Sequence, residues 1–125
     1  MWVPQVAGLK DRYRVVTIDL RGHGESDAPM WRYTLDQFAD DVHGLLEHLG
    51  IAKATFVGLS MGGYILFALY RKSPALFQSL VLADTRATAD TPEAKTARFS
   101  MAQICLLYTS PSPRDRTRSR MPSSA

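Results

Sequence analysis

The sequence predicts an α/β protein in which helices flank a parallel sheet, and two observations carry this prediction. First, β-branched and aromatic runs alternate with runs of helical apolar spacing, in the order helix, strand, helix, strand, helix, strand, helix. Second, helix start and stop signals fall between the strand-like runs. Such alternation is typical of layered α/β folds with right-handed crossovers, whose functional groups gather beyond the carboxyl ends of the strands.

The first 30 residues predict a helix, a strand and a loop. Met1–Lys10 has apolar residues at helical spacing, with a proline near its start. Tyr13–Leu20 is rich in β-branched residues and predicts a buried strand. Arg21–Pro29 contains two glycines and predicts a loop directly after that strand.

A second helix has the clearest local signals in the chain. Thr34 and Gln37 are spaced as a capping box, and Gly50 is placed to end the helix. The apolar residues between them predict one buried face. That face comprises Leu35, Phe38, Val42, Leu45, Leu46 and Leu49.

The remaining elements follow in quick succession. A strand over Ala54–Val57 leads into Ser60, and a helix follows that includes Tyr64–Tyr70 and stops before a Ser-Pro pair. Ser79–Asp84 predicts another strand. The Thr-Pro-Glu sequence at Thr91 then starts a last helix.

The sequence Gly58-Leu-Ser-Met-Gly62 lies between one of these strands and the helix that follows it. A serine on such a tight turn has its hydroxyl directed out of the sheet, where a base can reach it. Small neighbours allow the turn to close. We therefore expect Ser60 to be a nucleophile, activated by a histidine, and the backbone N–H of Met61 to stabilise an oxyanion.

Composition gives no reason to expect a nucleic acid or a membrane as partner. The net charge of +3 arises from residues 105–125, which carry four arginines and one aspartate, whereas residues 1–104 are balanced. The single cysteine excludes an internal disulfide framework. The first residues show no signal-peptide pattern, and the longest uncharged run is broken by glycines, so we expect a cytoplasmic protein.

Three motifs together resemble the α/β-hydrolase superfamily. They are Asp19-Leu-Arg-Gly-His-Gly-Glu-Ser26, Gly58-Leu-Ser-Met-Gly-Gly63 and Leu80-Val-Leu-Ala-Asp-Thr85. The last two are most similar to the 3-oxoadipate enol-lactonase branch. The resemblance implies a serine hydrolase of small carboxylic esters or lactones that works through an acyl-enzyme and needs no cofactor. Within it, Ser60 matches the nucleophile and Met61 matches the oxyanion donor.

The resemblance also implies that residues 1–104 are a fragment of a hydrolase core, a partial α/β-hydrolase fold. A His-Gly oxyanion loop is expected before Met1, and the triad acid and histidine after residue 104. One strand is missing between Val15–Asp19 and Thr55–Val57. Asp84 is an alternative position for the acid, whereas His23 precedes Ser60 and is expected to shape the pocket. The alternative functions are a related esterase, a cofactor-free haloperoxidase-like protein, or a truncated chain without activity.

Residues 105–125 differ from the rest of the chain in composition. Cys105–Asp115 resembles the translation of a sequencing adapter, and Ser119–Ala125 resembles the distal adapter in the same frame. We therefore expect residues 105–125 to be a non-native, disordered tail that takes no part in the fold.

Overall fold

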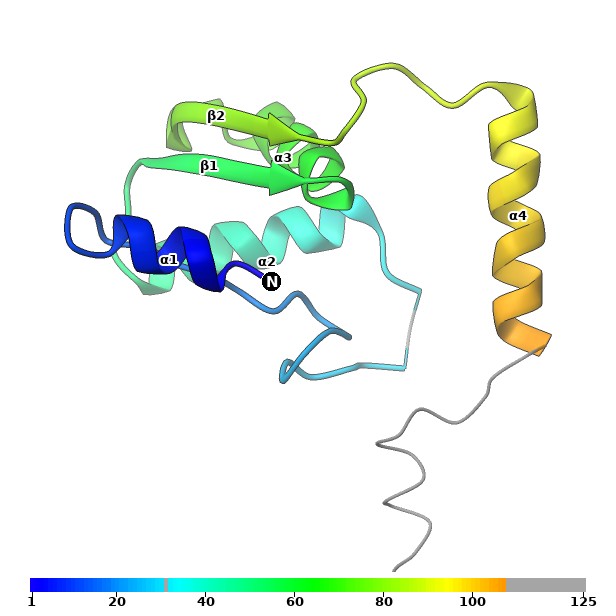
Figure 1. Cartoon of the computed structure of the whole chain (residues 1–125), viewed down its shortest axis with the longest axis horizontal. Coiled ribbons are helices and arrows are strands. Elements are labelled where there is room, and N and C mark those ends of the chain that lie inside the picture. Colours follow the sequence, from blue (N-terminus) through cyan, green and yellow to red (C-terminus); the bar gives the residue numbers. More distant parts are fainter. Residues whose placement is uncertain (31, 108–125) are drawn as a thin grey trace, which may run out of the picture. The chain divides into compact units, whose positions relative to one another are not determined.

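The computed structural model describes residues 1–30 and 32–107, which divide into two units, Met1–Ala87 and a second that begins at Thr88 (Figure 1). The first unit contains helices on a parallel sheet, so the α/β class predicted from the sequence is confirmed. The described part of the second unit contains one helix. The elements are, in order, α1 (Val3–Leu9), α2 (Leu35–His48), β1 (Ala54–Leu59), α3 (Met61–Lys72), the 3-10 turn η1 (Pro74–Leu76), β2 (Phe77–Ala83) and α4 (Pro92–Leu107).

The two described strands, β1 and β2, are parallel neighbours, and α3 forms the crossover between them (Figure 1). The register pairs Thr55 with Ser79 and continues to Leu59 opposite Ala83. Because the strands run in the same direction, their carboxyl ends meet at one edge of the sheet. Ser60 and Asp84, which directly follow β1 and β2, therefore leave the sheet side by side.

The strand predicted over Tyr13–Leu20 is a wrong prediction. Residues 14–20 have no strand pairing, and the side chains of Val16 and Ile18 are 42% and 37% exposed. A strand needs a neighbour for its N–H and C=O groups, and β1 pairs with β2. The resemblance placed another strand between this segment and β1, and the described residues contain none, so the β-branched pattern has no ladder to join.

Helix α2 begins and ends as its sequence predicted. The Thr34 hydroxyl accepts a hydrogen bond from the Gln37 N–H, and the Gln37 side chain accepts one from the Thr34 N–H. At the other end Gly50 has a φ of 66°, and Ile51 donates to the Leu46 carbonyl at 2.8 Å. This C-terminal geometry is a Schellman motif, which satisfies carbonyls that the last turn leaves unpaired.

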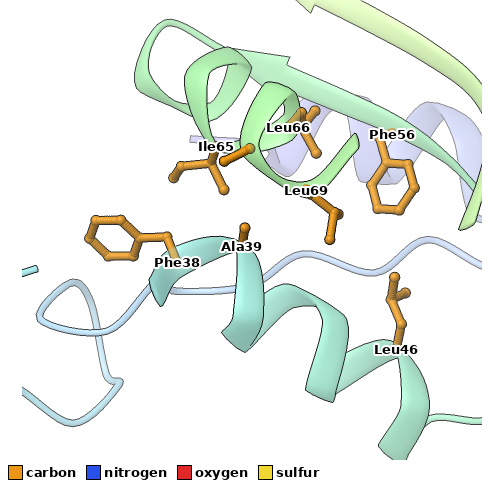
Figure 2. Close-up of a cluster of buried hydrophobic side chains, with 8 residues drawn as sticks. Phe38, Ala39, Leu46, Phe56, Ile65, Leu66 and Leu69 are labelled. Atoms are coloured by element: carbon orange, nitrogen blue, oxygen red, sulfur yellow. The ribbon is translucent and has the colours of Figure 1, made fainter. Parts of the chain in front are cut away.

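The core lies between α2, α3 and one face of the sheet (Figure 2). Phe38, Ala39 and Leu46 of α2 face the apolar side of α3, and Phe56 of β1 closes the cluster. Alanines in both helices, Ala39 and Ala68, are fully buried and let the helices approach closely. Leu35, which the sequence placed on the buried face, is 40% exposed, whereas Ala39 takes the central position.

The second unit has its own start signal. The Thr91 hydroxyl accepts a hydrogen bond from the Ala94 N–H at 3.3 Å, and Arg98 pairs with Asp90 at 2.6 Å. Helix α4 continues through residue 105 as far as Leu107. The predicted boundary after residue 104 stays a prediction, and residues 108–125 of the adapter-like tail lie outside the described residues.

Candidate active site

Ser60 occupies a sharp turn between β1 and α3 and has an unusual backbone conformation. Its φ of 49° and ψ of −113° lie in a region that residues with a Cβ rarely adopt. Such a conformation costs on the order of 1–3 kcal/mol and persists only where the surroundings enforce it. The surroundings are tight here, because a Cβ on Gly58 would lie 2.8 Å from both the Gly62 carbonyl carbon and Leu66 Cδ1.

The Ser60 hydroxyl is not used to cap the helix. Ser60 stands at the N-cap of α3, where a serine side chain commonly accepts a hydrogen bond from the first turn, yet it makes no such bond. Met61 is the first residue of the helix, and N–H groups at this position have no acceptor within the helix. A hydroxyl and a backbone N–H are thus both available at the start of α3.

The end of β2 holds this turn from the neighbouring strand. The Ser60 N–H donates to the Ala83 carbonyl at 2.9 Å, and the Thr85 hydroxyl donates to the Ser60 carbonyl at 2.8 Å. Asp84, between these two partners, has a φ of 44° and an exposed side chain. Ser60 and Asp84 are the two residues other than glycine with positive φ among the described residues, and they stand at adjacent strand ends.

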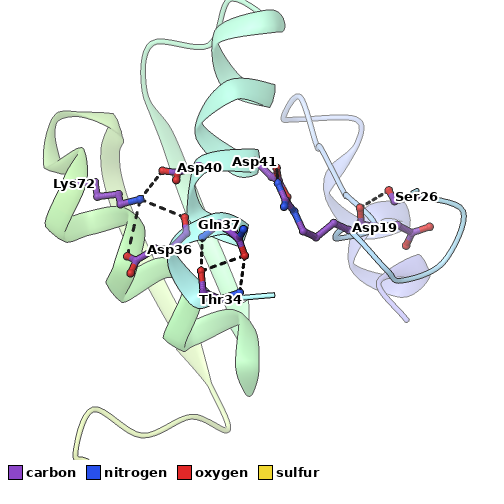
Figure 3. Close-up of polar contacts among 9 residues, drawn as sticks. Asp19, Ser26, Thr34, Asp36, Gln37, Asp40, Asp41 and Lys72 are labelled. Atoms are coloured by element: carbon purple, nitrogen blue, oxygen red, sulfur yellow. Dashed lines mark hydrogen bonds and ion pairs between the residues drawn. The ribbon is translucent and has the colours of Figure 1, made fainter. Parts of the chain in front are cut away.

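The loop after residue 20 is organised by Asp19 (Figure 3). The Asp19 carboxylate accepts a hydrogen bond from the Glu25 N–H at 3.0 Å, and its backbone carbonyl accepts one from the Ser26 hydroxyl at 2.6 Å. A Cβ on Gly24 would overlap the Asp19 carboxylate, and Gly24 has a φ of 55°. The close approach and the positive φ both require glycine at this position.

An ion pair ties this loop to α2. The Arg21 guanidinium makes a bidentate contact with the Asp41 carboxylate, both bonds measuring 2.5 Å. The hydrogen bond to Asp41 is the main reason why the pKa of Arg21 is raised above its ordinary value. An arginine guanidinium is charged throughout the physiological pH range, so Arg21 offers a permanent positive partner to the Asp41 carboxylate.

None of the chain's three histidines is hydrogen-bonded to Ser60. His23 Nδ1 lies 3.0 Å from the Arg21 carbonyl, and its ring packs edge-on against Phe38. His43 contacts Ser73 and Glu47, and His48 lies exposed in the last turn of α2. All three histidines lie within the described residues, and each contact given above joins a group other than Ser60.

Other possible sites are less developed in the described part of the chain. Two open hollows in the surface both include Thr17, Ile18 and Asp19 in their lining, and Ser60 lines neither of them. No group of three or more potential metal ligands occurs among residues 1–30 and 32–107. In the same residues, we find no helix with the length and apolarity needed to cross a bilayer.

Comparison with known proteins defines the class. A family model for the alpha/beta hydrolase fold matches residues 1–105, and the chain therefore belongs to this family. It is 45% identical to 3-oxoadipate enol-lactonase 1 from Acinetobacter baylyi over 98 residues, which are 78% of this chain and 36% of that protein.

Two solved structures are similar in fold as well as in sequence. An esterase from Thermogutta terrifontis has a TM-score of 0.78 at 45% identity, covering 83% of this chain and 39% of that one. The enol-lactonase from Burkholderia xenovorans has a TM-score of 0.70 at 42% identity, covering 82% and 39%. The chain thus spans less than half the length of the relatives it matches.

One contact at this turn, from Thr85 to Ser60, was not predicted from the sequence. Ser60 and Met61, its predicted catalytic residues, do lie together at the turn, although their roles stay predictions. The contact of Thr85 with the Ser60 carbonyl was not foreseen, because it joins residues 25 positions apart. The available signal was the short Ala-Asp-Thr sequence directly after the neighbouring strand.

Proposed function

We propose that this chain carries the nucleophile of a serine hydrolase that acts on small carboxylic esters or lactones, with Ser60 as the attacking residue. The strained backbone at Ser60 is the observation that carries the proposal. It occurs at a strand-to-helix turn in a family of hydrolases, and the Ser60 side chain does not cap the following helix. Strain of this kind clusters at functional sites.

The proposed reaction has two steps. Ser60 Oγ adds to the substrate carbonyl while a histidine takes its proton, and the Met61 N–H binds the resulting oxyanion. When the intermediate collapses, the ester bond breaks and the leaving alcohol takes the proton from the histidine. Water then attacks the acyl carbon while the histidine takes its proton. The second intermediate collapses, the acid is released, and Ser60 Oγ takes that proton back from the histidine. In a lactone the leaving oxygen stays attached to the acyl group, so the ring opens.

The relatives support the substrate class. The chain is 45% identical to a 3-oxoadipate enol-lactonase and equally identical to an esterase of known structure. We therefore propose an enol-lactone as the preferred substrate and a simple ester as the alternative. The histidine and the triad acid would come from parts of the natural protein outside this chain, with Asp84 as the alternative acid. A cytoplasmic location belongs to the same proposal.

The experiment begins with the DNA that flanks this sequence in its natural source. The extended protein is expressed, and hydrolysis of p-nitrophenyl acetate and of an enol-lactone is measured for wild type, Ser60→Ala and Ser79→Ala. Ser60→Ala should lower kcat on the order of a million-fold. Ser79→Ala is the matched control, because it removes a serine hydroxyl from β2, opposite Thr55 in the register and outside the turn. A Ser60→Ala variant that keeps a tenth of the wild-type rate would rule out the proposal.

A further inference from the structure

The carbonyl group of Ser60 is held from two sides. It accepts a hydrogen bond from the Gly63 N–H at 3.0 Å and a second from the Thr85 hydroxyl at 2.8 Å. The first bond belongs to the turn itself, whereas the second comes from the residue after Asp84, beyond the end of the neighbouring strand. Thr85 therefore fastens the turn to the segment that follows β2.

The Thr85 side chain also fits closely against Gly63. A Cβ on Gly63 would lie 2.5 Å from Thr85 Oγ1, 2.6 Å from Thr85 Cγ2 and 2.8 Å from Thr85 Cβ. The threonine side chain thus occupies the space that a larger residue 63 would fill. Gly63 is buried and Thr85 is half-buried, so the side chain is seated against the first turn of α3.

The Ser60 carbonyl that Thr85 contacts belongs to the same peptide group as the Met61 N–H. A peptide unit is planar and trans, so its C=O and its N–H point in opposite directions. Fixing the Ser60 carbonyl from Thr85 therefore also fixes the direction of the Met61 N–H. That N–H is the group proposed above to bind the oxyanion.

We propose that Thr85 is a positioning residue whose hydroxyl orients the Ser60–Met61 peptide group, and through it the oxyanion-binding N–H. This inference rests on the proposed function for its catalytic meaning. The structural part of the inference, that Thr85 orients this peptide group, is independent of the proposed function, because the orientation of a peptide group can be measured without any reaction. Loss of the hydroxyl frees the carbonyl on one side and lets the peptide plane rotate.

Two substitutions separate the hydroxyl from the shape of the side chain. Thr85→Val keeps the shape and removes the hydroxyl, whereas Thr85→Ser keeps the hydroxyl and removes a methyl group. In isotope-labelled chain, the Ser60 carbonyl carbon and Met61 amide resonances should move in Thr85→Val and return towards wild-type positions in Thr85→Ser. Thr55→Val, at an exposed position on β1, is the matched control and should leave both resonances in place.

A purely space-filling threonine would give the opposite pattern, with resonances unmoved in Thr85→Val and displaced in Thr85→Ser, and this result would overturn the inference.

In the extended protein, Thr85→Val should lower kcat for p-nitrophenyl acetate tenfold or more with little change in KM, and Thr85→Ser should restore most of it. An inactive extended wild type would refute the proposed function, while the resonances would still decide the role of Thr85. An active Thr85→Val variant with unmoved resonances would refute the positioning role alone.

Discussion

Ser60 has a backbone conformation that is uncommon for residues other than glycine, and the residues around it explain how the turn closes. Gly58 lies where any side chain would meet the backbone of Gly62. Ala83 at the end of β2 and Thr85 just beyond it then hold the two peptide groups of Ser60. At the scale of single residues, the site thus consists of one strained position and the small or hydrogen-bonding residues that maintain it.

The space around Gly58 makes a testable prediction. Gly58→Ala should lower the free energy of unfolding by about 1–3 kcal/mol, because the new Cβ would lie 2.8 Å from the Gly62 carbonyl carbon and would force the backbone to shift. Gly44→Ala is the matched control. Gly44 is exposed within α2 and has nothing near its Cβ position, so this change should raise stability by about 0.5–1 kcal/mol. Urea denaturation followed by circular dichroism measures the unfolding free energy of each variant. Equal midpoints for Gly58→Ala and Gly44→Ala would contradict the claim that the turn has no room for a Cβ at Gly58.

At the residue scale, the local signal in the sequence located the turn between β1 and α3, whereas the roles of Ser60 and Met61 stay predictions. Ser60 and Met61 could be located because strand, turn and helix are contiguous. The role of Thr85 could not be predicted, since its partner is 25 residues away and the contact depends on β1 and β2 being neighbours in parallel. The order of strands in a sheet is a non-local property that no motif encodes directly.

At the scale of elements, α2 and α3 followed their local signals and Tyr13–Leu20 did not. A helix satisfies its own backbone hydrogen bonds, so a capping box and apolar spacing are sufficient to predict it. A strand depends on a partner, and residues 14–20 have none in the described structure. The same β-branched composition therefore predicted β1 and β2 correctly and the earlier segment wrongly.

Because α3 lies between the sheet and α2, truncating its buried side chains should destabilise the fold more than truncating exposed side chains of α2. Leu69 is fully buried in this layer, and Leu69→Ala should lower the free energy of unfolding by about 2–5 kcal/mol. Leu35→Ala removes the same atoms from a side chain that is 40% exposed, and it should cost less than about 1 kcal/mol. Thermal or urea unfolding distinguishes the two; similar losses for both variants would argue against α3 as the central layer.

At the scale of the whole molecule, the chain is a section of a larger family fold. It spans 36–39% of the relatives described above. The sheet face opposite α3 is open, with Val57 and Val81 about half exposed. The three histidines all lie elsewhere than at Ser60. Fold class and family could be predicted from the sequence, because both depend on motifs that this section contains.

The absence of a histidine at Ser60 predicts that this chain alone does not turn over esters. Loss of the base in a serine triad lowers kcat on the order of a million-fold, so the chain and its Ser60→Ala variant should hydrolyse p-nitrophenyl acetate at the same background rate. The extended protein should be active in the same assay and should lose that activity with Ser60→Ala. Ser60-dependent turnover by the chain alone would show that the base lies within it.

The central claim is that Ser60 carries the acyl group, and the most direct measurement is to trap that group. The extended protein is mixed with p-nitrophenyl acetate and quenched in acid within one turnover, and its peptides are then mapped by mass spectrometry. We predict one acetyl group on the peptide that contains Ser60, at the serine itself, and none in Ser60→Ala. An acetyl group on a different residue, or rapid turnover with unmodified Ser60 throughout, would contradict the claim.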